Sequence, residues 1–516
     1  MLKTKLREHP VYVLVAVLLA IGFFTFRDYG LAWDEPLFYD YGEALKYAYT
    51  PSNWFSGEFD LTQSFGASGS DHANRGPAYL LVAMPPVSFL KWLGLDSASA
   101  WHLVNFLTFN LGVYLLYRRA SKLMEKRSAL SAASLFALQP LLWGHAFINP
   151  KDIPFLTFFL GAVTFGFELI DKWNADPQSA NLPISNLLLA SFFLGIATSI
   201  RILGPLAVVL VLLYALTQKI KKPGLIRVFW LYATTSVLIS FIAWPYLWLN
   251  PLQKFVEVFV FMSDNPTQLN VLFAGANYQA GEVPRRYFPT LLAYTLTEPT
   301  YILIALGIFL SFWKSENKKR LTLAVLLFWF GVLFAYILLR RPAMYDGYRH
   351  FLFILPPLFI FAGFSFEFLF KLLKQNWQKI AFAFCVFAFG VLPIIQLHPY
   401  QYVYYNNFAG GVGGVFREYE TEYWLTCYRE AVLEFNKTAP EGAQLFIRRE
   451  PYIAAYYADS NITIRDFRAE QKDMHPGDYY LVNTRSNEDL KFLRGEAAIV
   501  EVSRVGATFC LIKQVP

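Results

Sequence analysis

Two adjacent carboxylates follow the first apolar segment, in Trp33-Asp34-Glu35-Pro36, and Tyr39 stands close behind them. A carboxylate that is partly removed from water at a membrane boundary has a raised affinity for protons, so Asp34 is a candidate general base toward a hydroxyl group. The same two residues also suit the cap of a helix that begins at Pro36, because negative charge and side-chain acceptors stabilise its exposed amides. Spacing alone leaves both interpretations open.

A second polar loop runs from His145 to Pro154 and contains Lys151 and Asp152. Asp152 lies between two prolines at the start of an apolar segment, where it could orient an acceptor or help to hold a metal ion. Lys151 is suited to a phosphate group. The alternative is a helix cap beside a lysine that reaches the membrane interface.

Three further basic residues stand at the ends of apolar segments, namely Arg201, Arg349 and His350. An arginine in such a place can form paired, charge-assisted hydrogen bonds with a lipid headgroup or a phosphate leaving group. The alternative is ordinary snorkelling of a long side chain into the headgroup layer.

His72 and Arg75 form a weaker polar cluster in the first loop, from which they could contact a headgroup or an acceptor. His72 and His145 lack the spacing of paired metal ligands, so a metal site would need acidic partners from separate loops. The sequence therefore names no certain cofactor and leaves a divalent metal possible.

The composition indicates a protein embedded in lipid. Hydrophobic residues make up 55% of the 516 residues and charged residues 16%, which is too apolar for one soluble core. Apolar segments of about 16 to 24 residues recur from Val11 to Leu397, and that length crosses the ~30 Å of hydrocarbon as a helix. The net charge of +7 comes from Lys and Arg in short loops, as the positive-inside rule expects, so nucleic-acid binding is not indicated.

The basic loops at residues 118–127, 219–227, 314–320 and 371–379 are predicted to be cytoplasmic. Residues 1–397 then form a transmembrane domain of about eleven spans, with external loops at 27–96 and 250–290. The spans are expected near residues 10–26, 97–117, 129–146, 154–171, 185–200, 202–218, 228–249, 291–312, 321–339, 350–370 and 379–397. This order places all candidate site residues on the extracytoplasmic face of the cell membrane. Residues 76–95, which contain Pro85-Pro86, are predicted to form an interfacial or re-entrant helix.

Residues 398–516 have a mixed polar and apolar texture and predict a small extracytoplasmic α/β domain. Strands are expected at residues 444–447, 462–467, 479–482 and 498–502. Two of the three cysteines, Cys427 and Cys510, fall in this region, and their spacing leaves open whether they are bonded.

Several motifs together resemble the C-type glycosyltransferase superfamily, in particular bacterial relatives of the protein O-mannosyltransferases and the aminoarabinose transferases. The resemblance covers roughly residues 10 to 430. It rests on Asp34-Glu35, Pro150-Lys151-Asp152, Gly347-Tyr348-Arg349-His350-Phe351 with Leu355-Pro356-Pro357, and His398-Pro399-Tyr400-Gln401-Tyr402-Val403-Tyr404-Tyr405-Asn406.

The resemblance implies a mainly α, polytopic helical bundle that transfers one sugar from a polyprenyl phosphate to a hydroxyl of a protein, lipid or glycan. A single displacement would invert the anomeric carbon. Asp34 would accept the acceptor proton, Glu35 would support it, and Asp152 matches the acidic position of the second loop. Arg349 is similar in placement to the basic residues that hold the lipid phosphate in that family. From residue type and position alone, Lys151, Arg201 and His350 are further candidates for the donor phosphate, and His72, Arg75 and Tyr39 are candidates for contact with the acceptor or a headgroup.

A transporter or a flippase for lipid-linked sugars is the main alternative, since many spans with a few charges at helix ends also suit a permease. Two features oppose it. The acidic residues cluster in external loops, away from the bilayer midplane, and the two halves show no evident repeat.

Overall fold

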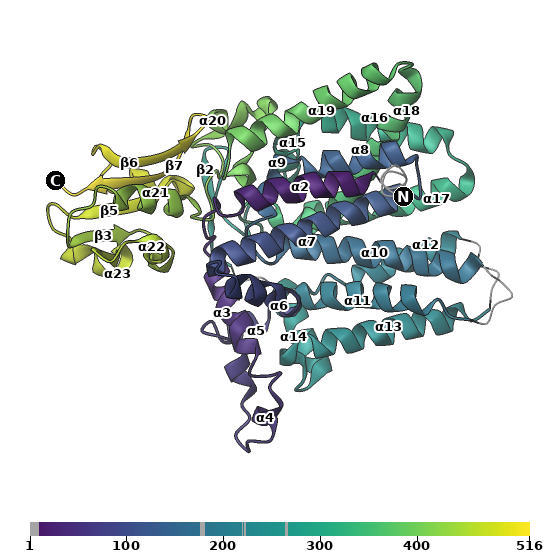
Figure 1. The fold of residues 1–516 in the computed structure, drawn as a ribbon, viewed down its shortest axis with the longest axis horizontal. Helices are drawn as coiled ribbons and strands as arrows, with labels where there is room; N and C mark the ends of the chain where they lie inside the picture. Colours follow the sequence, from purple (N-terminus) through teal and green to yellow (C-terminus); the bar gives the residue numbers. More distant parts are fainter. Residues whose placement is uncertain (1–9, 176–180, 219, 221–222, 264–266) are drawn as a thin grey trace.

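The computed structural model describes residues 10–175, 181–218, 220, 223–263 and 267–516, and it is mainly helical (Figure 1). Each of the eleven predicted span ranges contains a helix. In chain order these are α2 (Val11–Thr25), α7 (Ser97–Ala120), α8 (Lys126–Ala137) with α9 (Pro140–His145), α10 (Asp152–Ala175), α11 (Ile184–Ile200), α12 (Leu206–Thr217), α13 (Leu225–Ile242), α15 (Tyr287–Thr295) with α16 (Glu298–Lys314), α17 (Asn317–Arg340), α18 (Pro356–Leu372) and α19 (Asn376–Gln396).

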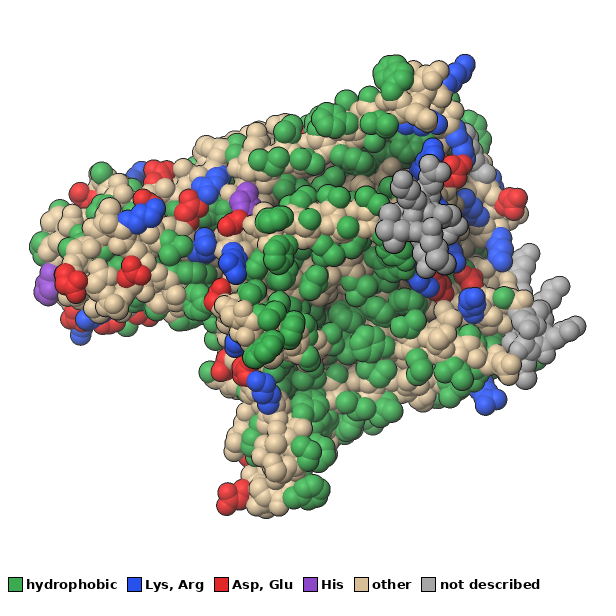
Figure 2. All heavy atoms as spheres, in the orientation of Figure 1, with side chains coloured by type: hydrophobic (Ala, Val, Ile, Leu, Met, Phe, Trp, Pro, Cys, Tyr) green, Lys and Arg blue, Asp and Glu red, His purple; other side chains and the backbone are tan. Residues whose placement is uncertain are grey.

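Within the described ranges, four helices are long and apolar enough to cross a membrane, namely α10, α13, α17 and α19. The bent pair α15 and α16, which meet at 106°, would make a fifth span. The chain therefore carries apolar membrane-spanning helices, and the count of about eleven spans stays a prediction. Figure 2 shows hydrophobic side chains over the middle of the helices and charged side chains gathered toward their two ends.

Helix α10 forms the centre of the bundle, and its apolar stretch is wholly buried. It packs against α7, α11 and α12, and it also contacts the short helix η3 (Arg349–Ile354). Asp152 begins α10, Arg201 directly follows α11, and Arg349 begins η3. The packing of these elements therefore brings three charged element ends to one place.

The first loop folds into short helices beside the bundle: α3 (Glu35–Leu45), α4 (Pro51–Trp54), η1 (Leu61–Ser64), α5 (Ser70–Ala73) and α6 (Ala78–Trp92). Helix α6 lies in the stretch predicted to be interfacial, and Pro85 and Pro86 are both inside it. Its depth in a membrane stays a prediction. The later loop contains η2 (Pro245–Leu247), α14 (Pro251–Ser263) and the antiparallel pair β1 (Asn270–Phe273) and β2 (Ala276–Gln279).

The C-terminal region contains a five-stranded sheet at one end of the molecule (Figure 1). Its strand order is β4-β3-β5-β7-β6; β3 runs parallel to β4 and β5, and β7 runs antiparallel to β5 and β6. The elements after α19 are η4 (Gln401–Val403), η5 (Asn407–Ala409), α20 (Gly411–Val415), α21 (Cys427–Asn436), β3 (Ala443–Ile447), α22 (Pro451–Tyr457), β4 (Ile462–Asp466), α23 (Phe467–Glu470), η6 (Gln471–Asp473), β5 (Tyr479–Asn483), η7 (Arg485–Leu490), β6 (Ala498–Arg504) and β7 (Ala507–Gln514).

The four predicted strands coincide with β3, β4, β5 and β6, while β7 was not predicted. Cys427 and Cys510 form a disulfide, with Cα atoms 5.9 Å apart, which settles the question that their spacing left open. The bond ties α21 to β7, which lies between β5 and β6 in the sheet. The domain boundary at residue 397 stays a prediction.

Candidate active site

A cavity of about 390 Å³ lies where the first loop, α11, α14, α17 and η3 meet. One part of its lining is polar and mostly basic, and the other part is apolar. The polar part comprises Asp34, Asn74, Arg75, Lys151, Arg201, Tyr345, Arg349 and His350. The apolar part includes Leu203, Leu206, Val258, Phe259, Met262, Val332 and Leu333.

Arg349 lies at the centre of a cluster of three carboxylates. Its Nη1 is 3.1 Å from Oδ2 of Asp152, and its Nη2 is 3.2 Å from Asp346 and 3.6 Å from Asp34. Burial by itself lowers the pKa of Arg349, but the three carboxylates outweigh it and raise the pKa well above the usual value. Arg349 is therefore a permanent cation that the protein holds in a fixed place.

Asp152 does not line the cavity; it lies behind two arginines and holds them. Its side chain is 1% exposed, its Oδ1 accepts a hydrogen bond from Arg201, and its Oδ2 pairs with Arg349. Its position at the first residue of α10 also suits a negative charge, because the amides of a helix start are exposed there. Asp152 is therefore placed to orient two cations, the guanidinium groups of Arg201 and Arg349.

Several cationic groups in the cavity retain capacity for an anion. Among the described residues, neither Nε of Arg201 nor Nε of Arg349 has a hydrogen-bond partner, although both atoms are buried. Lys151 is 8% exposed and lies 5.4 Å from the Phe38 ring, and the described part of the chain places no carboxylate within 4 Å of its Nζ. Burial, with Arg75 and Arg201 nearby, lowers the pKa of Lys151 well below its usual value. A bound anion would reverse that effect.

Asp34 directly precedes α3, and its carboxylate faces the cavity with 25% of the side chain exposed. Burial raises its pKa, and the positive charges of Arg349 and Arg75 oppose the rise. His350 also lines the cavity, directly after Arg349.

Glu35 and Tyr39 face away from the cavity into an enclosed cluster. Glu35 is fully buried; Oε2 accepts a 2.7 Å hydrogen bond from the Ala32 amide, and Oε1 accepts one of 2.7 Å from the Tyr39 hydroxyl. His102 Nε2 lies 3.2 Å from the same carboxylate. The predicted roles of Glu35 and Tyr39 stay predictions, and the contacts seen here hold the chain that precedes α3.

His72 is also outside the cavity, since its ring stacks against Phe38 and Tyr41 with centroids 5.0 and 5.5 Å away. Arg75 lines the cavity. The first loop therefore contributes Asp34 and Arg75 to the cavity lining, while His72 packs against Phe38 and Tyr41. The predicted headgroup contact of His72 stays a prediction.

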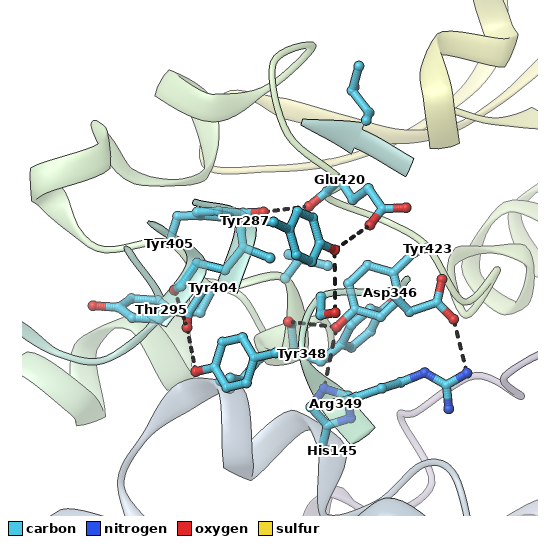
Figure 3. Close-up of a pocket in the computed structure, with 16 residues that line it drawn as sticks. His145, Tyr287, Thr295, Asp346, Tyr348, Arg349, Tyr404, Tyr405, Glu420 and Tyr423 are labelled. Carbon is cyan, nitrogen blue, oxygen red and sulfur yellow. Dashed lines mark hydrogen bonds and ion pairs between the residues drawn. The ribbon is translucent and has the colours of Figure 1, made fainter. Parts of the chain in front are cut away.

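Sequence reasoning missed Asp346, Trp424, Glu420 and Arg485. Asp346 and Gly347 both have a positive φ, of 55° and 68°, which marks the tight turn that aims the carboxylate. A second, smaller cavity of about 20 Å³ lies behind Asp346 and is lined by Glu420 and several tyrosines. Figure 3 shows the Asp346 carboxylate directed at the guanidinium of Arg349. For Glu420, the sequence signal was the alternation of acidic residues in Glu418-Tyr419-Glu420-Thr421-Glu422.

No group of three His, Cys, Asp or Glu side chains is arranged to hold a metal ion within the residues that the structure describes. The polar lining of the cavity is instead rich in arginine and lysine, which recognise anions.

No protein-family model and no curated protein matches the chain, but solved structures do. ArnT from Cupriavidus metallidurans in the apo state has a TM-score of 0.52 and 13% identity, and the match covers 97% of both chains. The same protein bound to undecaprenyl phosphate has a TM-score of 0.50, with equal identity and coverage. The archaeal oligosaccharyltransferase AglB from Archaeoglobus fulgidus, in complex with an inhibitory peptide and a dolichol-phosphate, has a TM-score of 0.53 and 10% identity over 94% of this chain and 70% of that one.

At such low identities the likeness shows the fold. The chain has the fold of the C-type membrane glycosyltransferases, as the sequence motifs predicted, and this agreement extends over nearly its whole length.

Proposed function

We propose that this protein transfers a sugar from a polyprenyl-phosphate donor to a hydroxyl acceptor on the extracytoplasmic face of the cell membrane, with inversion in a single displacement. The observation that carries the proposal is the composition of the large cavity. It combines one accessible carboxylate, a group of cations with unused donors and an apolar wall. That combination suits a ligand with a reactive centre, a phosphate and a hydrocarbon chain.

The donor phosphate would lie against Lys151, Arg201 and Arg349, with His350 beside them. These residues line the cavity, and the two arginines offer buried Nε donors that lack a partner in the described chain. Unpaired buried donors are costly, so a phosphate that accepts from them is bound with a clear gain. The polyprenyl chain would follow the apolar wall formed by α12, α14 and α17. Two of the similar folds were solved with undecaprenyl phosphate and with a dolichol-phosphate, which supports this class of donor.

Asp34 would act as the general base. In the proposed step the acceptor oxygen attacks the anomeric carbon, its proton passes to the Asp34 carboxylate, and the bond from that carbon to the phosphate oxygen breaks. The polyprenyl phosphate departs with the electron pair of the broken bond. Because phosphate is a good leaving group and the neighbouring cations stabilise its charge, no separate general acid is required. Asp152 would contribute by holding Arg201 and Arg349 in place.

The test is transfer by the purified protein in nanodiscs from a panel of polyprenyl-phosphate sugars, with a membrane extract as the source of acceptors. We expect one donor class to lose its sugar and to release polyprenyl phosphate in equal amount. The proposal would be overturned if no donor were consumed while proteoliposomes moved the same lipid across the bilayer, because that result identifies a flippase.

A further inference from the structure

The C-terminal region forms hydrogen bonds with the backbone of Trp33, the residue beside Asp34. The Trp33 amide donates a 3.2 Å hydrogen bond to the carbonyl of Trp424, and the Trp33 carbonyl accepts one of 2.6 Å from the Tyr452 hydroxyl. The guanidinium of Arg485 lies 5.0 Å from the centre of the Trp33 ring. The residue next to the candidate base is thus held on both its backbone and its side chain by residues that lie about 390 to 450 positions further along the chain.

Arg485 also reaches the cluster around Arg349. Its Nη2 is 2.7 Å from Oδ1 of Asp346, whose Oδ2 is 3.2 Å from Nη2 of Arg349. Trp424 donates from Nε1 to the same Oδ2 at 3.2 Å, and its ring lies 5.1 Å from the Arg349 guanidinium. Asp346 therefore divides its charge between two arginines, one on each side.

Arg485 itself is fixed. Its side chain is 2% exposed, and its Nη1 donates a 2.6 Å hydrogen bond to the Tyr423 carbonyl. The segment that carries Tyr423 and Trp424 is followed at once by Cys427, which is bonded to Cys510 in β7. A single guanidinium thus connects the C-terminal region to Trp33, which precedes Asp34, and to Asp346, which pairs with Arg349.

We propose that Arg485 is a positioning residue for sugar transfer. It fixes the position of Arg349 through Asp346 and the position of Asp34 through Trp33. The inference rests on the proposed function and deepens it, since it makes the C-terminal region part of the active site. Without Arg485, the Asp346 carboxylate has only Arg349 as a cation. It then draws Nη2 of Arg349 away from Asp34, from which that atom is already 3.6 Å distant.

The charged groups that face Asp34 are Arg349 and Arg75, which lower its pKa, and Asp346 and Asp152, which raise it. Lys151 and Tyr452 also face it, since the Asp34 charge raises the pKa of both. A withdrawn Arg349 leaves the two acidic neighbours less compensated, so the pKa of Asp34 rises further. Because the base must be deprotonated, the acid limb of kcat/KM then moves to higher pH. We expect a shift of about 0.5 to 1 pH unit, which is part of the effect of a close opposite charge.

The experiment compares Arg485→Gln, Arg485→Lys and Arg504→Gln with the wild type in nanodiscs. Arg504 is a matched control in the same region: it pairs with Glu430 at 2.7 Å, donates to the His398 carbonyl and lies 5.1 Å from the Tyr400 ring, but it contacts no residue of the site. We measure kcat and KM for the donor across pH, and the melting temperature of each variant. Asp34→Asn is assayed in parallel.

We expect Arg485→Gln to lower kcat at least tenfold and to move the acid limb upward, while Arg504→Gln changes neither. Arg485→Lys keeps the charge and should recover most of the position of the acid limb. The inference is overturned if Arg485→Gln keeps the wild-type limb and loses activity only in proportion to folded protein, while Asp34→Asn is inactive. Failure of the proposed function has a different signature, since then the wild type consumes no donor or Asp34→Asn remains fully active.

Discussion

The cavity around Asp34 and the enclosed cluster around Glu35 lie one residue apart on the chain, yet their surroundings differ. Glu35 has its acceptors filled by the Ala32 amide, the Tyr39 hydroxyl and His102. Asp34 is partly exposed, and the cations beside it retain donors that the described chain does not use. A group whose partners are all supplied by the protein stabilises the fold, whereas a group left with open partners can bind and react.

The largest effect should follow from Asp34→Asn, which removes the base and keeps the shape. We expect kcat to fall by about 10² to 10⁴, the usual contribution of general base catalysis, with little change in melting temperature. The measurement is the steady-state transfer rate at saturating donor. Full activity in the variant would exclude Asp34 as the base.

Glu35→Gln should show the reverse pattern. The substituted amide turns a donor toward groups that now donate to Glu35, so the free energy of unfolding should fall by about 1 to 3 kcal/mol. Thermal unfolding in detergent measures the loss, and the folded fraction should still transfer sugar. A variant that is stable and inactive would instead place Glu35 in the chemistry, beside Asp34.

Lys151→Met tests whether the cations that line the cavity bind the donor phosphate. We expect about tenfold weaker binding of undecaprenyl phosphate at neutral pH, since one charge-assisted contact is lost. The pKa of Lys151 lies well below its usual value when the cavity is empty and is raised when an anion binds. An anion that raises this pKa is bound together with a proton, so affinity in the wild type should fall as the pH rises from neutral toward the usual pKa of lysine. In the variant the affinity should stay flat over that range, and an equal slope in both proteins would contradict the assignment.

Glu420→Gln should give the smallest effect, and that effect is on the stability of the fold. Burial raises its pKa to about 7, against the opposing charge of Arg485. The folded protein therefore holds a proton that the unfolded chain releases, and this contribution to stability, complete below pH 4, is lost as pH rises through 7. Melting temperatures of Glu420→Gln and the wild type at pH 5 and pH 8 provide the check. The melting temperature of the variant should rise relative to that of the wild type at pH 8. A relative rise at pH 5 instead would show that the pKa of Glu420 is shifted in the opposite direction.

Much of the fold follows from local pattern. Apolar length predicted a helix in each expected range, and alternation predicted β3 to β6, because both signals depend on neighbours along the chain. Strand β7 was missed since Phe509 to Ile512 is a continuous apolar run without alternation, in a strand that lies between β5 and β6.

The site could be predicted only where it lies at the ends of helices. Asp34, Lys151 and Arg349 stand beside apolar segments, where charge is conspicuous. The sequence named Asp34 as the candidate base and Glu35 as its supporting neighbour, but it could not show that Asp34 lines a cavity while Glu35 is enclosed, because the turn before α3 decides which side chain meets the cavity. Asp346 and Arg485 were out of reach for a different reason: their contact joins residues 139 positions apart, and only the tertiary fold brings them together.

The cavity beside Asp34 should hold a lipid phosphate. The most direct measurement is a cryo-EM structure of the protein in nanodiscs with undecaprenyl phosphate. We predict that the phosphate lies within hydrogen-bond distance of Nζ of Lys151 and Nε of Arg349, with the lipid chain along the apolar wall of the cavity. A phosphate bound at another place, with the cavity empty at saturating lipid, would contradict the account.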